Sequence, residues 1–363
     1  MTQTLLVTST GESTGKTAIT LALGLLAKER GLDVGYMKPK GTRLQSNVGK
    51  TLDLDPMLAR ELLDLDAEMH QMEPIVYSPT FVRGAIRGQQ DPDELADTVR
   101  EQYDSLADGR DLMLVEGGGT HTTGGIVDLT DPQVADLLDA EVLLVTEYTE
   151  PTDLDALLAA ADDIGDRLGG VLFNRVADAV YDELENDVVP FLEARGVPVV
   201  GVVPRVQELA GVSVADLAAE LGAEIVTDVP TDAFVERFLV GAMGGDEALR
   251  YFRRTKNAAV ITGGDRAEIH TAALEAPGVK CLLLTGAHQP PSAVVGKAEQ
   301  KGVPVLLVSG DTLSVVERCE DVVHSGRTRD ERTVGRMRDL LFEHADTDSL
   351  VGSGPEPERD ESA

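Results

Sequence analysis

The stretch Thr8-Ser9-Thr10-Gly11-Glu12-Ser13-Thr14-Gly15-Lys16-Thr17 decides the fold class of this chain. It follows an apolar run at residues 5–7 that predicts a buried strand. It precedes residues 18–30, where isoleucine and leucine recur at helical spacing. A strand, a short glycine-containing loop and a helix form the context that a phosphate-binding loop requires. The sequence therefore predicts such a loop, in preference to a turn that contains Gly-Lys-Thr by chance.

The residue types in this loop predict how it would hold a ligand. Backbone N–H groups at Ser13, Thr14 and Gly15 would point at phosphate oxygens, and the dipole of the following helix favours an anion there. The Lys16 ammonium would reach the outer phosphates. The Thr17 hydroxyl would ligate a Mg²⁺ ion that bridges them. These five residues are the first candidate site residues.

The loop departs from the common spacing Gly-x-x-x-x-Gly-Lys-Thr, because position 10 is threonine where that pattern has its leading glycine. A longer variant, with five residues before Gly15-Lys16-Thr17, places Ser9 at the glycine position. Ser9 is therefore the residue that distinguishes this loop from the usual one.

Other apolar runs in the first 210 residues also end at polar residues. Lys38 follows the run 34–37, Glu116 follows 112–115 and opens a run of three glycines, and Asn174 follows 170–173. The alternation of strands and helices predicts an α/β fold with a doubly wound parallel sheet. Ligands bind at the carboxyl ends of the strands in such sheets, which is where all these residues fall.

Several of these residues have a second, structural interpretation that spacing alone leaves open. Lys38 meets either an anionic ligand or solvent. Asn174 either reads an adenine edge or caps the next helix. Asp55 either acts as the N-cap of a helix that has Pro56 at its first position, or joins Asp53 in holding Mg²⁺. A plain turn, in contrast, does not explain a carboxylate at position 116 directly after four apolar residues.

The composition narrows the possible partners. The 363 residues include 64 acidic and 32 basic side chains, a net charge of −32, with 42% apolar residues. We interpret the acidity as adaptation to very high salt, which screens charge repulsion, rather than as a surface for a basic partner. The charge excludes nucleic acid as a partner. No apolar stretch reaches membrane-spanning length, and no signal peptide is evident. Cys281 and Cys319 indicate buried thiols in a reducing cytoplasm.

From about residue 216 the alternating pattern starts again and predicts a second, smaller α/β domain. Within it, Thr262-Gly263-Gly264-Asp265-Arg266 follows a predicted strand at 257–261. This turn either binds an anion or places Asp265 as the N-cap of the next helix. The predicted organisation is a phosphate-loop domain at 1–212, the second domain at 213–325, a helix at 326–345 and a disordered acidic tail at 346–363.

Several motifs of this chain resemble those of a known family. The resemblance is to dethiobiotin synthetase and, more closely, to the dethiobiotin-synthetase-like N-terminal region of long phosphotransacetylases. In that family the five-residue loop spacing is normal. Residues 216–323 are similar to the DRTGG domain that follows this region. The resemblance rests on Ser9-Thr10, Gly15-Lys16-Thr17, Lys38-Pro39, Glu116-Gly117-Gly118-Gly119, Phe173-Asn174-Arg175 and Gly201-Val202-Val203-Pro204.

The resemblance implies a role for each matched residue. Lys16 and Thr17 would hold the phosphates and Mg²⁺, Asn174 would read adenine, and Lys38 would face the γ-phosphate or an activated carboxylate. Lys16 and Lys38 are thus the candidate catalytic residues. The implied Mg²⁺ ligands are Thr17, Glu116 and Asp55, with Asp53 as the alternative aspartate.

The resemblance implies a regulatory protein that binds ATP, or another nucleoside triphosphate, with Mg²⁺, and whose DRTGG domain senses a ligand or docks a metabolic enzyme. The alternative is an ATP-dependent synthetase that activates a small carboxylate as an acyl phosphate. A third hypothesis is a scaffold with a relict loop. Because no acetyltransferase region follows, phosphotransacetylase activity is not expected of this polypeptide alone. A homodimer is expected by analogy.

Overall fold

The computed structural model describes residues 2–42, 44–47, 50–206, 209, 211–326 and 331–352. The chain forms two compact units. Unit 1 comprises Met1–Arg205 and Asp330–Ala363, and unit 2 comprises Val206–Arg329. Unit 2 is therefore an insertion, in sequence, between two parts of unit 1. The predicted boundary at 212 lies close to the observed one, but the C-terminal segment belongs to unit 1 rather than following the second domain as a separate helix and tail.

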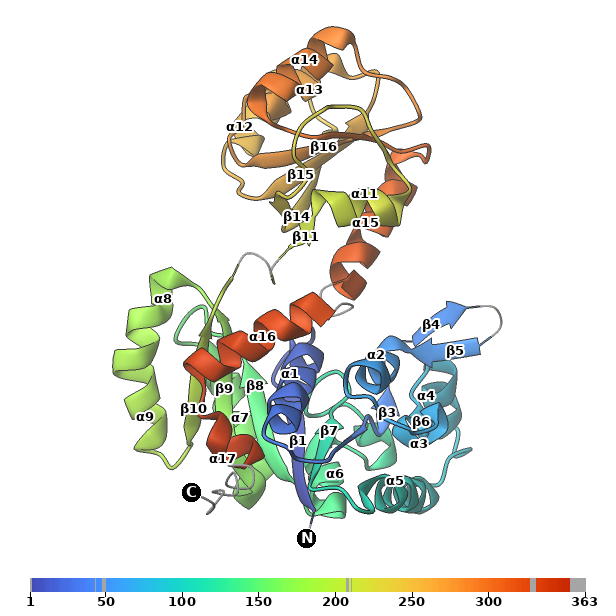
Figure 1. Ribbon diagram of the computed structural model, residues 1–363, viewed down its shortest axis with the longest axis vertical. Helices are drawn as coiled ribbons and strands as arrows, with labels where there is room; N and C mark the ends of the chain where they lie inside the picture. Colours follow the sequence, from blue (N-terminus) through green and yellow to red (C-terminus); the bar gives the residue numbers. More distant parts are fainter. Residues whose placement is uncertain are drawn as a thin grey trace, which may run out of the picture. The chain divides into compact units, whose positions relative to one another are not determined.

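Unit 1 contains a six-stranded sheet with the strand order β10-β9-β8-β1-β7-β2, in which every neighbouring pair is parallel (Figure 1). The central strand β1 carries the fully buried run 5–7 and lies between β7 and β8. The predicted doubly wound parallel sheet is confirmed. The strands of this sheet are β1 (Gln3–Ser9), β2 (Val34–Met37), β7 (Leu112–Glu116), β8 (Glu141–Thr146), β9 (Leu168–Val176) and β10 (Val199–Pro204).

Short strand pairs and helices complete unit 1. The pairs are β3 (Lys40–Gly41) with β6 (Ile75–Val76), and β4 (Leu44–Asn47) with β5 (Lys50–Asp53). The helices are α1 (Lys16–Glu29), α2 (Leu54–Leu62), α3 (Met69–Met72), α4 (Pro79–Ile86), α5 (Pro92–Ala107), α6 (Asp131–Leu138), α7 (Asp153–Ile164), α8 (Asp178–Glu183), α9 (Val189–Glu193), α16 (Glu331–His344) and α17 (Thr347–Val351), with single turns η1 (Gly125–Val127), η2 (Gly165–Arg167) and η3 (Leu184–Val188).

The C-terminal helices α16 and α17 pack against α1, and α16 also packs against β10 (Figure 1). Arg30, at the end of α1, donates hydrogen bonds to the Thr347 and Gly352 carbonyls and forms an ion pair with Asp348. Residues 346–352, predicted to be a disordered tail, are thus ordered, because Leu350 and Val351 fill the core of unit 1. The rest of that predicted tail, 353–363, lies outside the described residues.

Unit 2 contains a five-stranded sheet with the order β12-β17-β16-β15-β14, in which β12 is antiparallel to β17 and the other pairs are parallel. The predicted second, smaller α/β domain is confirmed. Its elements are β11 (Val212–Ser213), α11 (Val214–Leu221), β12 (Glu224–Ile225), β13 (Phe234–Val235), β14 (Arg237–Val240), α12 (Gly245–Phe252), β15 (Ala258–Gly263), α13 (Ala267–Leu274), β16 (Val279–Thr285), α14 (Ser292–Lys301), β17 (Val305–Leu307) and α15 (Thr312–Gly326).

Two predictions about unit 2 can be compared with the structure. Cys281 and Cys319 are free thiols buried in its core, as expected. Asp265 is not the N-cap of α13. That position belongs to Arg266, whose guanidinium donates hydrogen bonds to the Gly241 carbonyl at 2.6 Å and to the Met243 carbonyl at 3.0 Å. Arg266 therefore ties the turn after β15 to the chain that leaves β14.

A helix long and apolar enough to cross a bilayer is not found among the residues described above.

Candidate functional site

The phosphate-binding loop connects the end of β1 to the start of α1. Gly15 is the N-cap of α1 in a left-handed conformation with φ = 97°, and no side chain caps this end of the helix. A Cβ at position 15 would lie 2.6 Å from Asn174 Nδ2, so both the backbone angle and the space require glycine. Ser13 is also left-handed, with φ = 55°. The loop thus presents the N–H groups of the first turn of α1 without a protein carboxylate or hydroxyl as their cap.

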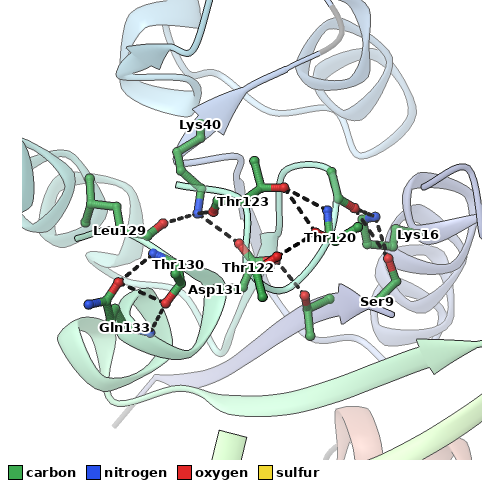
Figure 2. Close-up of polar contacts among 12 residues, drawn as sticks. Ser9, Lys16, Lys40, Thr120, Thr122, Thr123, Leu129, Thr130, Asp131 and Gln133 are labelled. Atoms are coloured by element: carbon green, nitrogen blue, oxygen red, sulfur yellow. Dashed lines mark hydrogen bonds and ion pairs between the residues drawn. The ribbon is translucent and has the colours of Figure 1, made fainter. Parts of the chain in front are cut away.

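Lys16 lies at the first position of α1, and its side chain folds back toward β1 (Figure 2). Its ammonium donates to Ser9 Oγ at 2.7 Å and to the Gly119 carbonyl. The residue is 8% exposed. Next to it, the buried hydroxyl of Thr14 has no hydrogen-bond partner within the described part of the chain. A buried, unpaired hydroxyl in this loop fits a site built for a ligand that supplies the missing partner.

Thr17, in the first turn of α1, meets Glu116 at the end of β7. The register of β1 with β7 places Val7 beside Glu116, and α1 follows β1 by one loop. Thr17 Oγ1 donates to Glu116 Oε1 at 2.7 Å, and the Tyr36 hydroxyl donates to Glu116 Oε2 at 2.8 Å. Burial raises the pKa of Glu116, and the nearby Lys38 ammonium opposes that rise. The carboxylate is thus fixed in position by two hydroxyl donors.

Lys38 lies among three carboxylates at the end of β2. Its Nζ is 2.8 Å from Asp53 Oδ2 and 3.6 Å from Glu116 Oε1, and it also contacts the Asp55 carboxylate. Burial alone would lower the pKa of Lys38, but Asp55, Glu116 and Asp53 raise it above its ordinary value. Since the side chain is only 2% exposed, the interpretation of Lys38 as a solvated loop lysine is wrong.

Asp53, rather than Asp55, caps α2. Asp53 Oδ1 accepts a hydrogen bond from Asp55 N at 3.0 Å, and its Oδ2 accepts one from Thr42 N at 3.2 Å. The prediction of Asp55 as N-cap is therefore wrong by two residues. Both carboxylates are buried and both contact Lys38. Residues 53–55 therefore cap α2 and also contribute to the candidate site.

The oxygen donors near Thr17 fit Mg²⁺, which prefers hydroxyl, carboxylate and water oxygens. Thr17, Glu116 and Asp55 supply one hydroxyl and two carboxylates that converge on the Lys38 region. No group of three or more His, Cys, Asp or Glu side chains with metal-binding geometry occurs within the described ranges. The predicted Mg²⁺ ligands include only two carboxylates, those of Glu116 and Asp55, and the Thr17 hydroxyl is the third protein donor.

Asn174 and Arg175 reach the phosphate-binding loop from the end of β9. Asn174 Nδ2 donates to the Thr14 carbonyl at 2.7 Å. Arg175, left-handed at φ = 58°, donates to the Ser13 carbonyl at 2.6 Å and pairs with Glu147 at 3.0 Å. Ala177 is the N-cap of α8, so the interpretation of Asn174 as a helix cap is wrong. Arg175 follows Asn174 in the sequence, but no pattern there predicts a role for it.

A buried ion pair beside the site was also missed. Lys40 Nζ donates to Asp131 Oδ1 at 3.0 Å, to the Thr123 carbonyl at 2.9 Å and to the Leu129 carbonyl (Figure 2). Asp131 Oδ2 accepts a hydrogen bond from Thr8 Oγ1 at 2.6 Å. The residues between Glu116 and α6 thus fold around the Lys40 ammonium. In the sequence, Lys40 was marked only by its proximity to Lys38, because its partner Asp131 lies 91 residues away.

Glu73 is a further buried carboxylate near this cluster. It is 7% exposed, and its Oε1 is unpaired within the described structure. A Cβ on Gly41 would lie 1.7 Å from that oxygen, so Gly41 is required for the close approach. Burial, followed by the charge of Asp53, raises the pKa of Glu73 to about 7. The sequence held no pattern that marked this residue.

Comparison with protein families identifies the larger unit. A family model described as an AAA domain matches residues 3–213, more than half of the chain. The chain belongs to this AAA domain family. A second model, described as a DRTGG domain, matches residues 216–322. The order of the AAA domain and the DRTGG domain confirms the resemblance proposed from the sequence.

Two relatives of this AAA domain protein come from the families that the sequence resembles. Phosphate acetyltransferase of Nitrosomonas europaea is 24% identical over 378 residues, which cover 98% of this chain and 52% of the relative. The ATP-dependent dethiobiotin synthetase BioD of Frankia casuarinae is 36% identical over 150 residues, 39% of this chain and 58% of the relative. The chain spans about half the length of these curated relatives.

A solved structure of the CBS and DRTGG domains of Clostridium perfringens pyrophosphatase covers 31% of this AAA domain protein and 46% of that chain, with 24% identity and a TM-score of 0.25.

Proposed function

We propose that the AAA domain binds ATP together with Mg²⁺ and that it hydrolyses ATP weakly or only in the presence of a second substrate. The observation that carries this proposal is the arrangement around the phosphate-binding loop. Lys16 and Thr17 lie at the uncapped amino end of α1, Thr17 is bonded to Glu116, and the buried Thr14 hydroxyl lacks a partner in the described structure. Uncapped N–H groups, an ammonium and a helix dipole together favour a polyphosphate.

In this proposal Mg²⁺ would be held by Thr17, Glu116 and Asp55, with Asp53 as the alternative aspartate. The ion would neutralise part of the phosphate charge and bring the outer phosphate oxygens into a fixed arrangement. The chain's own part is to hold the hydroxyl and carboxylates in place. Tyr36 fixes Glu116, and the α2 cap fixes Asp53 relative to Asp55.

Adenine recognition by Asn174 is part of the same proposal. Its side-chain nitrogen donates to the Thr14 carbonyl. This contact holds the amide against the phosphate-binding loop, and its Oδ1 would be the acceptor for an adenine amino group. Asn174 would thus connect recognition of the base to the shape of the loop. Ser13, Thr14 and Gly15 would bind phosphate through their N–H groups.

We further propose a regulatory role for the DRTGG domain, which would sense a metabolite or dock a metabolic enzyme. A homodimer, a cytoplasmic location and adaptation to high salt complete the proposal. The support for salt adaptation is the net charge of −32, which would destabilise the compact chain by self-repulsion at low ionic strength.

Isothermal titration calorimetry in molar potassium chloride tests nucleotide binding. ATP, ADP and GTP would be titrated with and without Mg²⁺ into the wild type, Lys16→Ala and the matched control Lys28→Ala, which removes an exposed lysine from the same helix. We expect Mg²⁺-dependent ATP binding in the wild type and in Lys28→Ala, and none in Lys16→Ala. Unchanged affinity in Lys16→Ala would move the site elsewhere.

A second candidate function is that of an ATP-dependent synthetase that activates a small carboxylate as an acyl phosphate. The position of Lys38 favours it, because a buried ammonium beside the phosphate site is suited to a reacting anion, which binding alone does not require. Phosphate release from ATP would be measured in the presence of each of a panel of small carboxylates. Turnover that disappears in Lys38→Arg, which keeps the positive charge among the three carboxylates, while ADP still binds, would establish the synthetase.

A further inference from the structure

The position of the Lys16 ammonium leads to an inference about how this site is regulated, and it rests on the proposed nucleotide function. Lys16 Nζ lies 2.7 Å from Ser9 Oγ and contacts the Gly119 carbonyl. One acceptor belongs to the strand that precedes the loop and the other to the segment that follows β7. We call these two hydrogen bonds the resting contacts of Lys16.

The direction of the Ser9 hydrogen bonds makes its hydroxyl an acceptor for Lys16. A hydroxyl has one proton and two lone pairs. Ser9 Oγ donates that proton to the Gly11 carbonyl at 2.6 Å, so a lone pair faces the ammonium. Glycine, the usual residue at the start of such loops, has no side-chain atom that could accept this hydrogen bond. Ser9 therefore provides a contact that the common loop lacks.

The Gly119 side of the resting contacts is held in place by further hydrogen bonds. His121 N donates to the Ser9 carbonyl at 2.9 Å, and Thr120 N donates to Thr123 Oγ1 at 3.0 Å. Lys40 Nζ donates to the Thr123 carbonyl at 2.9 Å (Figure 2). The segment 119–123 is thus tied both to Ser9 and to a buried ammonium, so the two acceptors for Lys16 keep a fixed separation.

We infer that Ser9 and Gly119 hold the Lys16 ammonium in a resting position and thereby lower the affinity of the site for nucleotide. A phosphate group is a stronger partner for an ammonium than a neutral hydroxyl is. In this inference, Lys16 gives up the resting contacts when it moves to the outer phosphates. Breaking those contacts costs free energy, which makes nucleotide binding less favourable. The Ser9 hydrogen bond accounts for part of this cost.

The test compares nucleotide affinity in the wild type, Ser9→Ala and the matched control Thr10→Ala. Thr10→Ala removes the neighbouring hydroxyl, which pairs with Thr146 at 2.9 Å. We expect Ser9→Ala to bind ATP and ADP roughly tenfold more tightly than the wild type, which corresponds to about 1.4 kcal/mol. AMP has no outer phosphate for Lys16 to reach, so its affinity should stay unchanged.

Each outcome distinguishes this inference from the proposed function. If the wild type binds ATP and Ser9→Ala binds it equally or more weakly, the inference is overturned and the proposed function stands. An equal gain for AMP, or an equal gain in Thr10→Ala, would indicate a general change in the loop and would also overturn it. If neither the wild type nor Ser9→Ala binds nucleotide while both stay folded, the proposed function itself fails. Binding in Ser9→Ala alone would support the inference in its strongest form.

Discussion

At the scale of single residues, Gly15 combines two constraints that Gly11, in the same phosphate-binding loop, lacks. It has φ = 97°, and a Cβ there would approach Asn174 Nδ2 to 2.6 Å. Gly15→Ala should therefore weaken nucleotide binding by about tenfold or more, since strain of about 1–3 kcal/mol would distort the first turn of α1. Gly11→Ala is the control, because its Cβ would meet only Thr14 Cγ2 at 3.5 Å. Calorimetry on both variants checks the prediction, and equal losses would contradict it.

Glu73 is the residue from which we expect a pH-dependent contribution to stability. Its pKa is about 7 in the folded chain against an ordinary value of 4.5. The folded state therefore binds more protons than the unfolded state between these values, so stability falls as pH rises through this window. Ionisation of Glu73 should lower the free energy of unfolding of the wild type by about 3 kcal/mol by pH 8, and Glu73→Gln should abolish this decrease.

Denaturant unfolding of Glu73→Gln and the wild type from pH 4.5 to 8 measures this difference. Glu94→Gln, at an exposed position of α5, provides the control. Parallel stability curves for Glu73→Gln and the wild type would refute the assignment of this titration to Glu73.

At the scale of elements, the buried pair of Lys40 on β3 and Asp131 on α6 joins two segments that lie far apart in sequence. Both side chains are fully or almost fully buried. Lys40→Met should lower the free energy of unfolding by about 3–5 kcal/mol, because it leaves a buried carboxylate without its cation. The double variant Lys40→Met/Asp131→Leu should recover part of that loss.

Chemical denaturation measures these variants alongside Arg167→Met. Arg167 pairs with Asp136 at 2.5 Å and with Asp139 at 2.9 Å, but the arginine is 29% exposed and the two aspartates are 75% and 94% exposed. Removing these surface pairs should change stability by less than about 1 kcal/mol. If Lys40→Met costs no more than Arg167→Met, the pair does not stabilise the segment between Glu116 and α6.

At the scale of the whole molecule, the chain returns to unit 1 after the inserted unit 2. Leu341 on α16 is 0% exposed, and the next residue, Phe342, is 71% exposed. Leu341→Ala should destabilise unit 1 by about 2–5 kcal/mol, because it leaves a cavity where α16 packs. Phe342→Ala should change stability by about 0.5 kcal/mol or less. Calorimetric unfolding of both variants tests this, and similar effects would show that α16 adds little to the core.

The local sequence predicted those features that depend on neighbouring residues. The loop at Thr8–Thr17, the strand that runs into Glu116 and the alternation of strands and helices follow from hydrophobic periodicity and from glycine conformations. Since parallel strands end at one edge of the sheet, the sequence also predicted that Lys16, Lys38, Glu116 and Asn174 would lie near each other. The contacts of Thr17 with Glu116 and of Asn174 with the loop agree with that prediction.

Only the tertiary structure decided which atoms meet. The pairing of Lys40 with Asp131, the burial of Glu73 against Gly41 and the packing of α16 on α1 join residues that are far apart in the chain, so no periodicity could reveal them. Local pattern also misassigned the cap of α2 and the segment 346–352. Short polar segments fit caps, loops and disorder equally well, and the choice among these depends on the apolar surface that the folded chain brings against them.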